Sequence, residues 1–193
     1  MMTRSHEAAR TLSNPGAFSL CLAALLATPA GAGATPPPTD ACELLADAEV
    51  RAVQERTVAG RIASTQESTA FRVLQCVYRT EDLAGSVSLA LAVPRAETPQ
   101  GARRYWETRF HPPAGAGRGT EQPPRPVPDL GDEAFWVGDA MTGSLYVLAG
   151  DGFLRISVGG TRDEAVREER AQTLAERALA RVVDVAGAAG APR

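Results

Sequence analysis

The stretch from Asp129 to Gly160 constrains the fold of this chain most, because it reads as three consecutive β-strands joined by short turns. We expect the strands at about 134–138, 144–149 and 153–158. Asp151-Gly152 is a two-residue sequence typical of a type I′ hairpin turn, and the segment from Asp139 to Gly143 supplies a five-residue loop. The stretch is therefore predicted to be an antiparallel meander.

These turns imply a register, and the register sorts side chains between two faces of the sheet. Trp136 is expected opposite Tyr146, and Leu148 opposite Arg155. One face is apolar and is the predicted core face: Phe135, Val137, Leu145, Val147, Leu154, Ile156 and Val158. The other face is aromatic and contains an arginine, and it is the predicted site for a ligand or partner: Trp136, Tyr146, Leu148, Phe153 and Arg155. Because such patches are seldom left bare, the alternative is that another segment, such as 111–130, covers this face.

The rest of the chain supplies two more strands and three helices. Alternating apolar residues predict strands at about 71–79 and 86–93. The first helix is expected at about 41–54, with Asp40 as its cap or with a second start at Asp47. A second helix is expected to begin at Thr98-Pro99. The third is expected to run from a capping box at Thr161 to about Val183. Residues 55–68 are polar and are predicted to be a loop, with room for a short strand. The order α-β-β-α-β-β-β-α predicts an α+β domain whose antiparallel sheet has about five strands, with the helices packed on one face.

Two of these helices have apolar stripes that are expected to pack on the sheet. The stripes are Ala102, Tyr105, Trp106 and Phe110 in one helix, and Ala171, Leu174, Ala175, Ala178 and Val182 in the other. An aromatic edge that faces a ligand is the alternative for the first stripe. The segment 111–130, which connects the second predicted helix to the meander, contains six prolines and three glycines. It is therefore predicted to be an irregular loop, either loose surface coverage or a ligand lid.

The first 34 residues have the features of a signal peptide. Arg4 and Arg10 precede an apolar run, Ala17 to Thr28, that is too short to span a bilayer, and small residues favour cleavage before Thr35. Residues 35–40 then form a Pro-rich tether, 41–184 a single domain, and 185–193 a flexible tail. We expect a periplasmic or secreted protein with no stable membrane span after cleavage. A membrane tether, through an uncleaved signal or a lipid at Cys21, is the alternative.

Two cysteines remain after cleavage, and in an exported chain they are expected to form a disulfide, Cys42 with Cys76. Two buried free thiols are the alternative. Neither cysteine is expected to bind zinc, because two cysteines and His111 do not make a tetrahedral site. No metal or other cofactor is predicted. The formal net charge of −3 argues against nucleic acid or an anionic membrane as the partner.

Three short motifs resemble small exported bacterial domains of unknown function, related to the extracellular sensor domain of bacterial Ser/Thr kinases and to lipoproteins. The motifs are DACELLADAEVRAV, QCVYR and LGDEAFW, with matching positions at Cys42, Leu44, Leu45, Cys76, Tyr78, Gly131, Asp132, Ala134 and Phe135. Ala46 departs from the pattern, because these families usually have Thr or Ser there. The resemblance implies a disulfide-linked α+β domain and no catalytic residues.

We therefore expect a non-enzymatic binding or accessory domain of the bacterial envelope, with an unknown small ligand or envelope protein as partner. The alternative is an envelope enzyme that uses Asp132 and Glu133 as a carboxylate pair, although carboxylates around Gly131 are also ordinary turn residues. A purely structural envelope protein is a third possibility. His111 is expected to be a helix-end residue that interacts with the helix dipole.

Overall fold

The computed structural model describes residues 38–113, 123–139 and 141–189, which belong to one compact unit. The predicted signal peptide, its cleavage site, Cys21, residues 35–37 of the tether and residues 114–122 of the 111–130 segment lie outside these ranges. So do residues 190–193 of the predicted tail.

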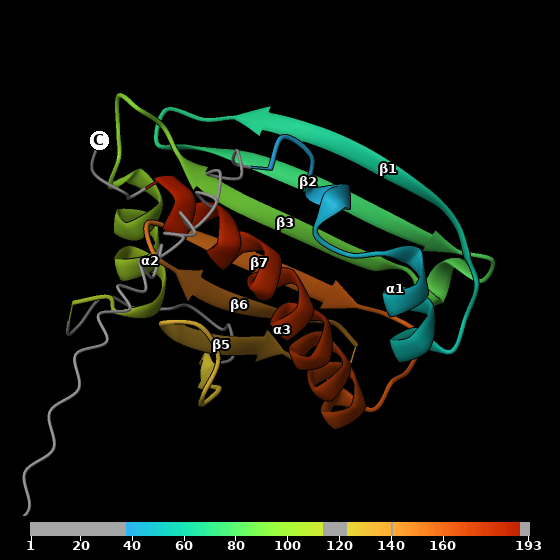
Figure 1. Ribbon diagram of the computed structural model, residues 1–193. Helices are drawn as coiled ribbons and strands as arrows, with labels where there is room; N and C mark the ends of the chain where they lie inside the picture. Colours follow the sequence, from blue (N-terminus) through green and yellow to red (C-terminus); the bar gives the residue numbers. More distant parts are fainter. Residues whose placement is uncertain (1–37, 114–122, 140, 190–193) are drawn as a thin grey trace, which may run out of the picture. The chain divides into compact units, whose positions relative to one another are not determined.

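Seven antiparallel strands form one sheet in the order β1-β2-β3-β7-β6-β5-β4 (Figure 1). The predicted α+β class and the Cys42–Cys76 disulfide are confirmed, but the sheet has seven strands rather than about five. The strands are β1 (Val58–Glu67), β2 (Phe71–Thr80), β3 (Val87–Pro94), β4 (Arg125–Pro126), β5 (Glu133–Gly138), β6 (Gly143–Ala149) and β7 (Gly152–Val158).

The two edge strands are the ones that the sequence pattern does not mark clearly: it leaves room for a short strand within 55–68 and indicates none at 125–126. β1 pairs with β2 over its whole length, yet its side chains are almost all exposed, so no apolar alternation marks it. β4 is only two residues long, and one of them is a proline. Edge strands bury few apolar side chains, so their sequences lack the alternation of apolar and polar residues that marks a central strand.

The helices lie on both faces of the sheet, whereas the sequence predicted them on one. On the first face, 3₁₀ helix η1 (Ala41–Glu43), α1 (Asp47–Gln54) and α3 (Glu164–Ala189) cover a large core. Figure 1 shows α3 running across β6 and β7, with α1 alongside it. The short α2 (Gly101–Phe110) covers part of the second face, over a separate aromatic cluster. A second 3₁₀ turn, η2 (Leu83–Gly85), joins β2 to β3.

The predicted stripes of α2 and α3 do pack on the sheet. Ala102, Trp106 and Phe110 are buried, while Tyr105 remains 40% exposed. In α3 the small and apolar stripe is buried against the first face: Ala171, Leu174, Ala175 and Ala178, with Val182 partly buried beside them. The helix is capped by Asp163, whose Oδ1 accepts from the backbone N–H groups of Ala165 and Val166, rather than by Thr161.

The first predicted helix is broken into η1 and α1. Asp40 caps η1 as expected, because its Oδ1 accepts from the Cys42 N–H at 2.7 Å. The break follows Leu44, and α1 begins at Asp47, the second start that the sequence allowed. η1 thereby lays Cys42 against β2 while α1 turns toward α3.

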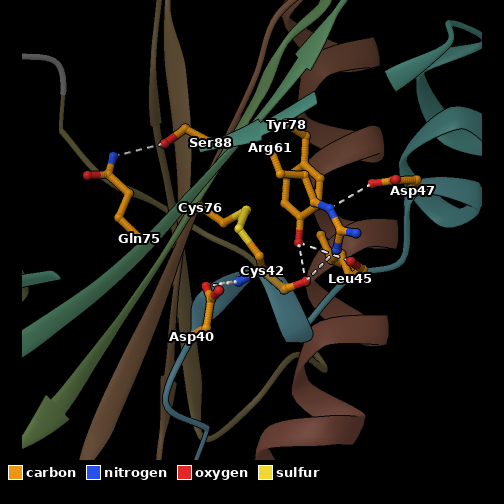
Figure 2. The surroundings of a disulfide bond; sticks show 9 residues. All are labelled: Asp40, Cys42, Leu45, Asp47, Arg61, Gln75, Cys76, Tyr78 and Ser88. Atoms are coloured by element: carbon orange, nitrogen blue, oxygen red, sulfur yellow. Dashed lines mark hydrogen bonds and ion pairs between the residues drawn. A yellow bond between two sulfur atoms is a disulfide. The ribbon is translucent and has the colours of Figure 1, made fainter. Parts of the chain in front are cut away.

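The disulfide joins η1 to the centre of β2, with a Cα–Cα distance of 5.0 Å (Figure 2). Tyr78 reinforces this connection from the same side of β2. Its hydroxyl group donates to the backbone of the η1–α1 segment, 3.0 Å from the Leu45 carbonyl oxygen. Burial raises the pKa of Tyr78 to about 12, although the hydrogen bond to Leu45 lowers it. A covalent bond and a buried hydroxyl thus fix the N-terminal part of the domain to the sheet.

Candidate functional site

The register of β5 differs by one residue from the predicted register, and this difference moves Trp136 off the predicted binding face. Gly138 pairs with Gly143, and Trp136 pairs with Leu145, so the connecting loop is one residue shorter than predicted. A one-residue slip exchanges the two faces of a strand. Trp136 is therefore buried in the core on the first face. Two residues predicted for the core lie instead on the second face: Phe135 and Val137.

The two glycines beside Trp136 account for this register. A Cβ atom at Gly143 would lie 2.2 Å from Cζ2 of the indole, and one at Gly138 would lie 2.7 Å from its Nε1. The ring can therefore lie across this end of the hairpin only because both positions lack a side chain. Its Nε1 donates to Oε1 of Glu164, in the first turn of α3, at 2.8 Å.

The β6–β7 hairpin keeps its predicted faces, although its partners are shifted by two residues. Gly150 and Asp151 occupy the turn, and only Gly150 has a positive φ, of 59°. Glycine at the first central position is typical of a type II′ turn rather than the predicted type I′. Tyr146 now pairs with Arg155. A shift of two residues retains each side chain's face, so Tyr146, Leu148, Phe153 and Arg155 lie on the second face as predicted.

Helix α2 covers one end of that face with an aromatic cluster. Leu148 and Phe153 are buried beneath it, at 4% and 7% exposure. The ring of Phe110 stacks on Phe135 with a centroid distance of 4.7 Å, and Tyr105 stacks on Phe153 at 5.4 Å. Two of the five predicted site residues are thus core residues of a second, smaller cluster, as the alternative of a covered face allowed.

The other end of the second face has no helix over it among the described residues, and we call it the open half. Its side chains are exposed or half-buried: Gln75, Val77, Arg79, Ser88, Ala90, Ser144, Arg155 and Ser157. Short hydrogen-bonded pairs run across it, from Gln75 Nε2 to Ser88 Oγ at 3.3 Å and between the hydroxyl groups of Ser144 and Ser157 at 2.6 Å. Figure 2 shows Gln75 and Ser88 on the side of the sheet away from the disulfide.

Arg155 lies at the centre of this open half. Its strand, β7, is flanked by β3 and β6, and its neighbours across the sheet are Ala90 and Tyr146. The side chain is exposed, and no ion pair or hydrogen bond joins it to another described residue. Ala90 is a small neighbour, while Tyr146 is half-buried and its ring makes an edge contact with Phe110 at 5.3 Å.

The open half is positively charged, although the whole chain has a formal charge of −3. Arg155 and Arg79 are the charged side chains that the described strands contribute to it. The one carboxylate that the described strands place on the second face is Glu133, at the other end and beside α2. An anionic group would therefore meet a positive potential at this surface.

Glu133 forms a second polar centre, with a partner that the sequence did not indicate. Its Oε2 accepts from Nε1 of Trp106 at 2.7 Å and contacts Nε2 of His111 at 2.8 Å. Burial raises the pKa of Glu133, but the hydrogen bonds from His111 and Trp106 outweigh it, so the pKa lies below its usual value. An ionised Glu133 accepts the Nε2–H of His111, which leaves Nδ1 as the nitrogen that can take a proton.

Asp132 and Glu133, the carboxylate pair of the predicted enzyme alternative, have different hydrogen-bond partners. Asp132 accepts from the Gly150 N–H at 2.8 Å and fixes the β6–β7 turn, which is a structural role. Both carboxylates do line one cavity of about 340 Å³ together with the segment from Pro126 to Leu130. His111 is 22 residues from Glu133 in sequence, and no local motif could have paired them.

A larger hollow, of about 680 Å³, lies at the start of α2 and contains none of the five predicted site residues. Phe71, Tyr105 and Arg104 contribute to its wall, with the β1–β2 turn and the segment before α2. Within the described ranges, no group of three or more His, Cys, Asp or Glu side chains is arranged to hold a metal ion. No described helix is both long and apolar enough to cross a membrane.

No family model matches this chain, and no curated protein matches it significantly.

Proposed function

We propose that this chain is a secreted or periplasmic, non-enzymatic binding domain that binds an anionic ligand on the open half. The proposal depends on Arg155, which is exposed at the centre of the sheet and forms no ion pair or hydrogen bond with another described residue. An arginine at such a position adds little to folding, while its planar guanidinium group suits a carboxylate or phosphate. The resemblance to exported domains related to the extracellular sensor domain of bacterial Ser/Thr kinases is consistent with a binding role.

The neighbours of Arg155 indicate the kind of ligand. Tyr146 offers an aromatic surface, and the hydroxyl groups of Ser88, Ser144 and Ser157 offer hydrogen bonds. Ala90 leaves space above the sheet. A small ligand with one anionic group and an apolar or aromatic part would use all of these features.

A thermal-shift screen with small aromatic carboxylates and phosphate monoesters tests the proposal, because a ligand raises the unfolding temperature by mass action. We expect Arg155→Gln to abolish the shift and to leave the unfolding temperature of the free protein nearly unchanged. Arg104→Gln, which changes an exposed arginine outside the open half, is the matched control and should keep the shift. Loss of binding in Arg104→Gln alone would instead locate the site in the 680 Å³ hollow.

An enzyme is the second candidate function, and the contact between His111 and Glu133 favours it. A carboxylate that orients an imidazole can make the imidazole a general base. This candidate predicts that the protein hydrolyses small esters and that His111→Gln and Glu133→Gln each reduce the rate at least a hundredfold, while Asp132→Asn retains it. If the unaltered protein has no hydrolytic activity, the candidate fails.

A further inference from the structure

The two edges of the sheet are protected very differently. β4, at one edge, has two residues, and its Pro126 has no N–H group to offer a further strand. β1, at the other edge, is a ten-residue strand whose one partner among the described strands is β2. Natural edge strands usually avoid association through lysine, proline, a bulge or short length. β1 has a register irregularity only between Val58 and Gly60, and it contains neither lysine nor proline.

β1 is also largely exposed on both faces among the described residues, although η1 and the start of α1 contact its first face through Arg61. From Ala59 to Glu67 every side chain is exposed, including Ile62 at 50%, a large apolar residue. The outer edge of the strand is therefore exposed along most of its length. Its outer backbone N–H and C=O groups are available to a further strand along about seven to nine residues.

We propose that β1 pairs with β1 of a second copy of this chain in an antiparallel arrangement centred on Ser64. This centre places Arg61 of each copy opposite Glu67 of the other, so that the two-fold axis creates two oppositely charged cross-strand pairs. Ile62 then lies opposite Gln66, and Ser64 opposite its own equivalent. Centring on Ala63 instead would place Arg61 opposite Thr65 and lose both charge pairs.

The present partners of these charges do not prevent the arrangement. Arg61 pairs with Asp47 at 3.3 Å and also donates to the Cys42 carbonyl oxygen at 3.3 Å, while Glu67 pairs with Arg95 at 3.1 Å. The side chains of both ion pairs are about one-third exposed or more. Exposed ion pairs of this kind are weak and exchange readily with water. Each charge can therefore contact a cross-strand partner as well.

The pairing would join two seven-stranded sheets into one continuous sheet. Opposite residues of antiparallel strands point to the same face, so the second faces of the two copies would lie on the same side. Two Arg155 side chains would then face the same direction, which suits a ligand that repeats along a polymer or a surface. The dimer itself does not depend on what the open half binds.

Sedimentation of the full-length protein over a range of concentrations tests the dimer. We expect concentration-dependent dimerisation that Glu67→Arg weakens roughly tenfold, since it places like charges opposite Arg61 twice. Arg61→Glu combined with Glu67→Arg should restore it. Glu107→Arg, which changes an exposed acid in α2, on the second face of the sheet, is the matched control and should leave the dissociation constant unchanged. A protein that stays monomeric at its highest soluble concentration, or a dimer insensitive to Glu67→Arg, would overturn the proposal.

The register is tested by cross-linking in a Cys21→Ser background, where Cys42 and Cys76 are already bonded to each other. Ser64→Cys should form a disulfide-linked dimer rapidly under mild oxidation, because its Cα would be about 4.5–5.5 Å from its equivalent. Gln66→Cys lies on the same face, but its equivalent would be too distant to bond. Cross-linking of Gln66→Cys in preference to Ser64→Cys would contradict this register.

Discussion

At the start of α1, the N-cap residue Ala46 has no side-chain atom that can accept a hydrogen bond. Only half of a capping box is present, in which Glu49 Oε2 accepts from the Ala46 N–H at 2.7 Å. We predict that Ala46→Ser stabilises the protein by about 0.5–1 kcal/mol, because its hydroxyl would accept from the N–H of Glu49. Ala48→Ser, at an exposed position inside the same helix, should be neutral or slightly destabilising. Equal effects of the two changes in chemical denaturation would contradict the capping explanation.

Tyr78 predicts a dependence of stability on alkaline pH. Its pKa is raised from 10.0 to about 12 in the folded protein, so between these values the unfolded chain loses a proton that the folded protein keeps. The contribution is complete below pH 10 and is lost as pH rises through about 12, by roughly 2–3 kcal/mol of unfolding free energy. Denaturation at several pH values should show this slope in the native protein. Tyr78→Phe should show a smaller slope, and an unchanged slope would rule out Tyr78 as its source.

Residue chemistry was predictable from sequence where it depended on one strand's own pattern. Arg155 and Tyr146 were correctly placed on the second face, because alternation along a strand is a local signal. The disulfide between Cys42 and Cys76 was predictable from the number of cysteines. The contact of His111 with Glu133 was not predictable, since it depends on where α2 ends above the sheet. Trp136 was misplaced for a related reason: its face depends on the length of a loop beside it.

Among the strands, β5 shows how packing rather than alternation selects a register. The indole of Trp136 occupies the space above two paired glycines at the end of the β5–β6 hairpin. We predict that Gly143→Ala destabilises the protein by about 1–3 kcal/mol, because a buried ring would have to move to admit the methyl group. Combining it with Trp136→Phe should cost less than the sum of the single changes.

Gly60→Ala in β1 is the control for this prediction. A Cβ atom there would have no neighbour within 4 Å, so the change should be neutral or slightly stabilising. Denaturant midpoints of all four variants give the comparison. If Gly143→Ala is as harmless as Gly60→Ala, steric exclusion by Trp136 does not set the register.

The central strands and the long C-terminal helix were predictable because their burial leaves a periodic pattern. The assignment of helices to faces was not. The stripes of α2 and α3 are both apolar and both pack on the sheet, so periodicity alone does not determine which face each helix covers. The connection into α2 decides this, where Gly101 approaches the Ala70 carbonyl so closely that a Cβ would lie 1.8 Å from its oxygen.

For the protein as a whole, the disulfide supports the proposed export, because such bonds form and persist mainly in oxidising compartments. We predict that mass spectrometry of periplasmic or secreted material finds a chain that starts near Thr35 and lacks two hydrogens from Cys42 and Cys76. Alkylation before and after reduction should label these two cysteines only after reduction. A cytoplasmic chain with an intact N-terminus and free thiols would contradict the predicted localisation.

The link between η1 and β2 also determines how the domain would respond to mechanical tension. A pull applied at Asp40 passes through Cys42 and the disulfide into Cys76, at the middle of β2. The force therefore bypasses α1 and β1, which lie between the two cysteines in sequence. These elements cannot be peeled away one by one from the N-terminal side. Extension from that side must therefore begin by shearing β2 from the sheet.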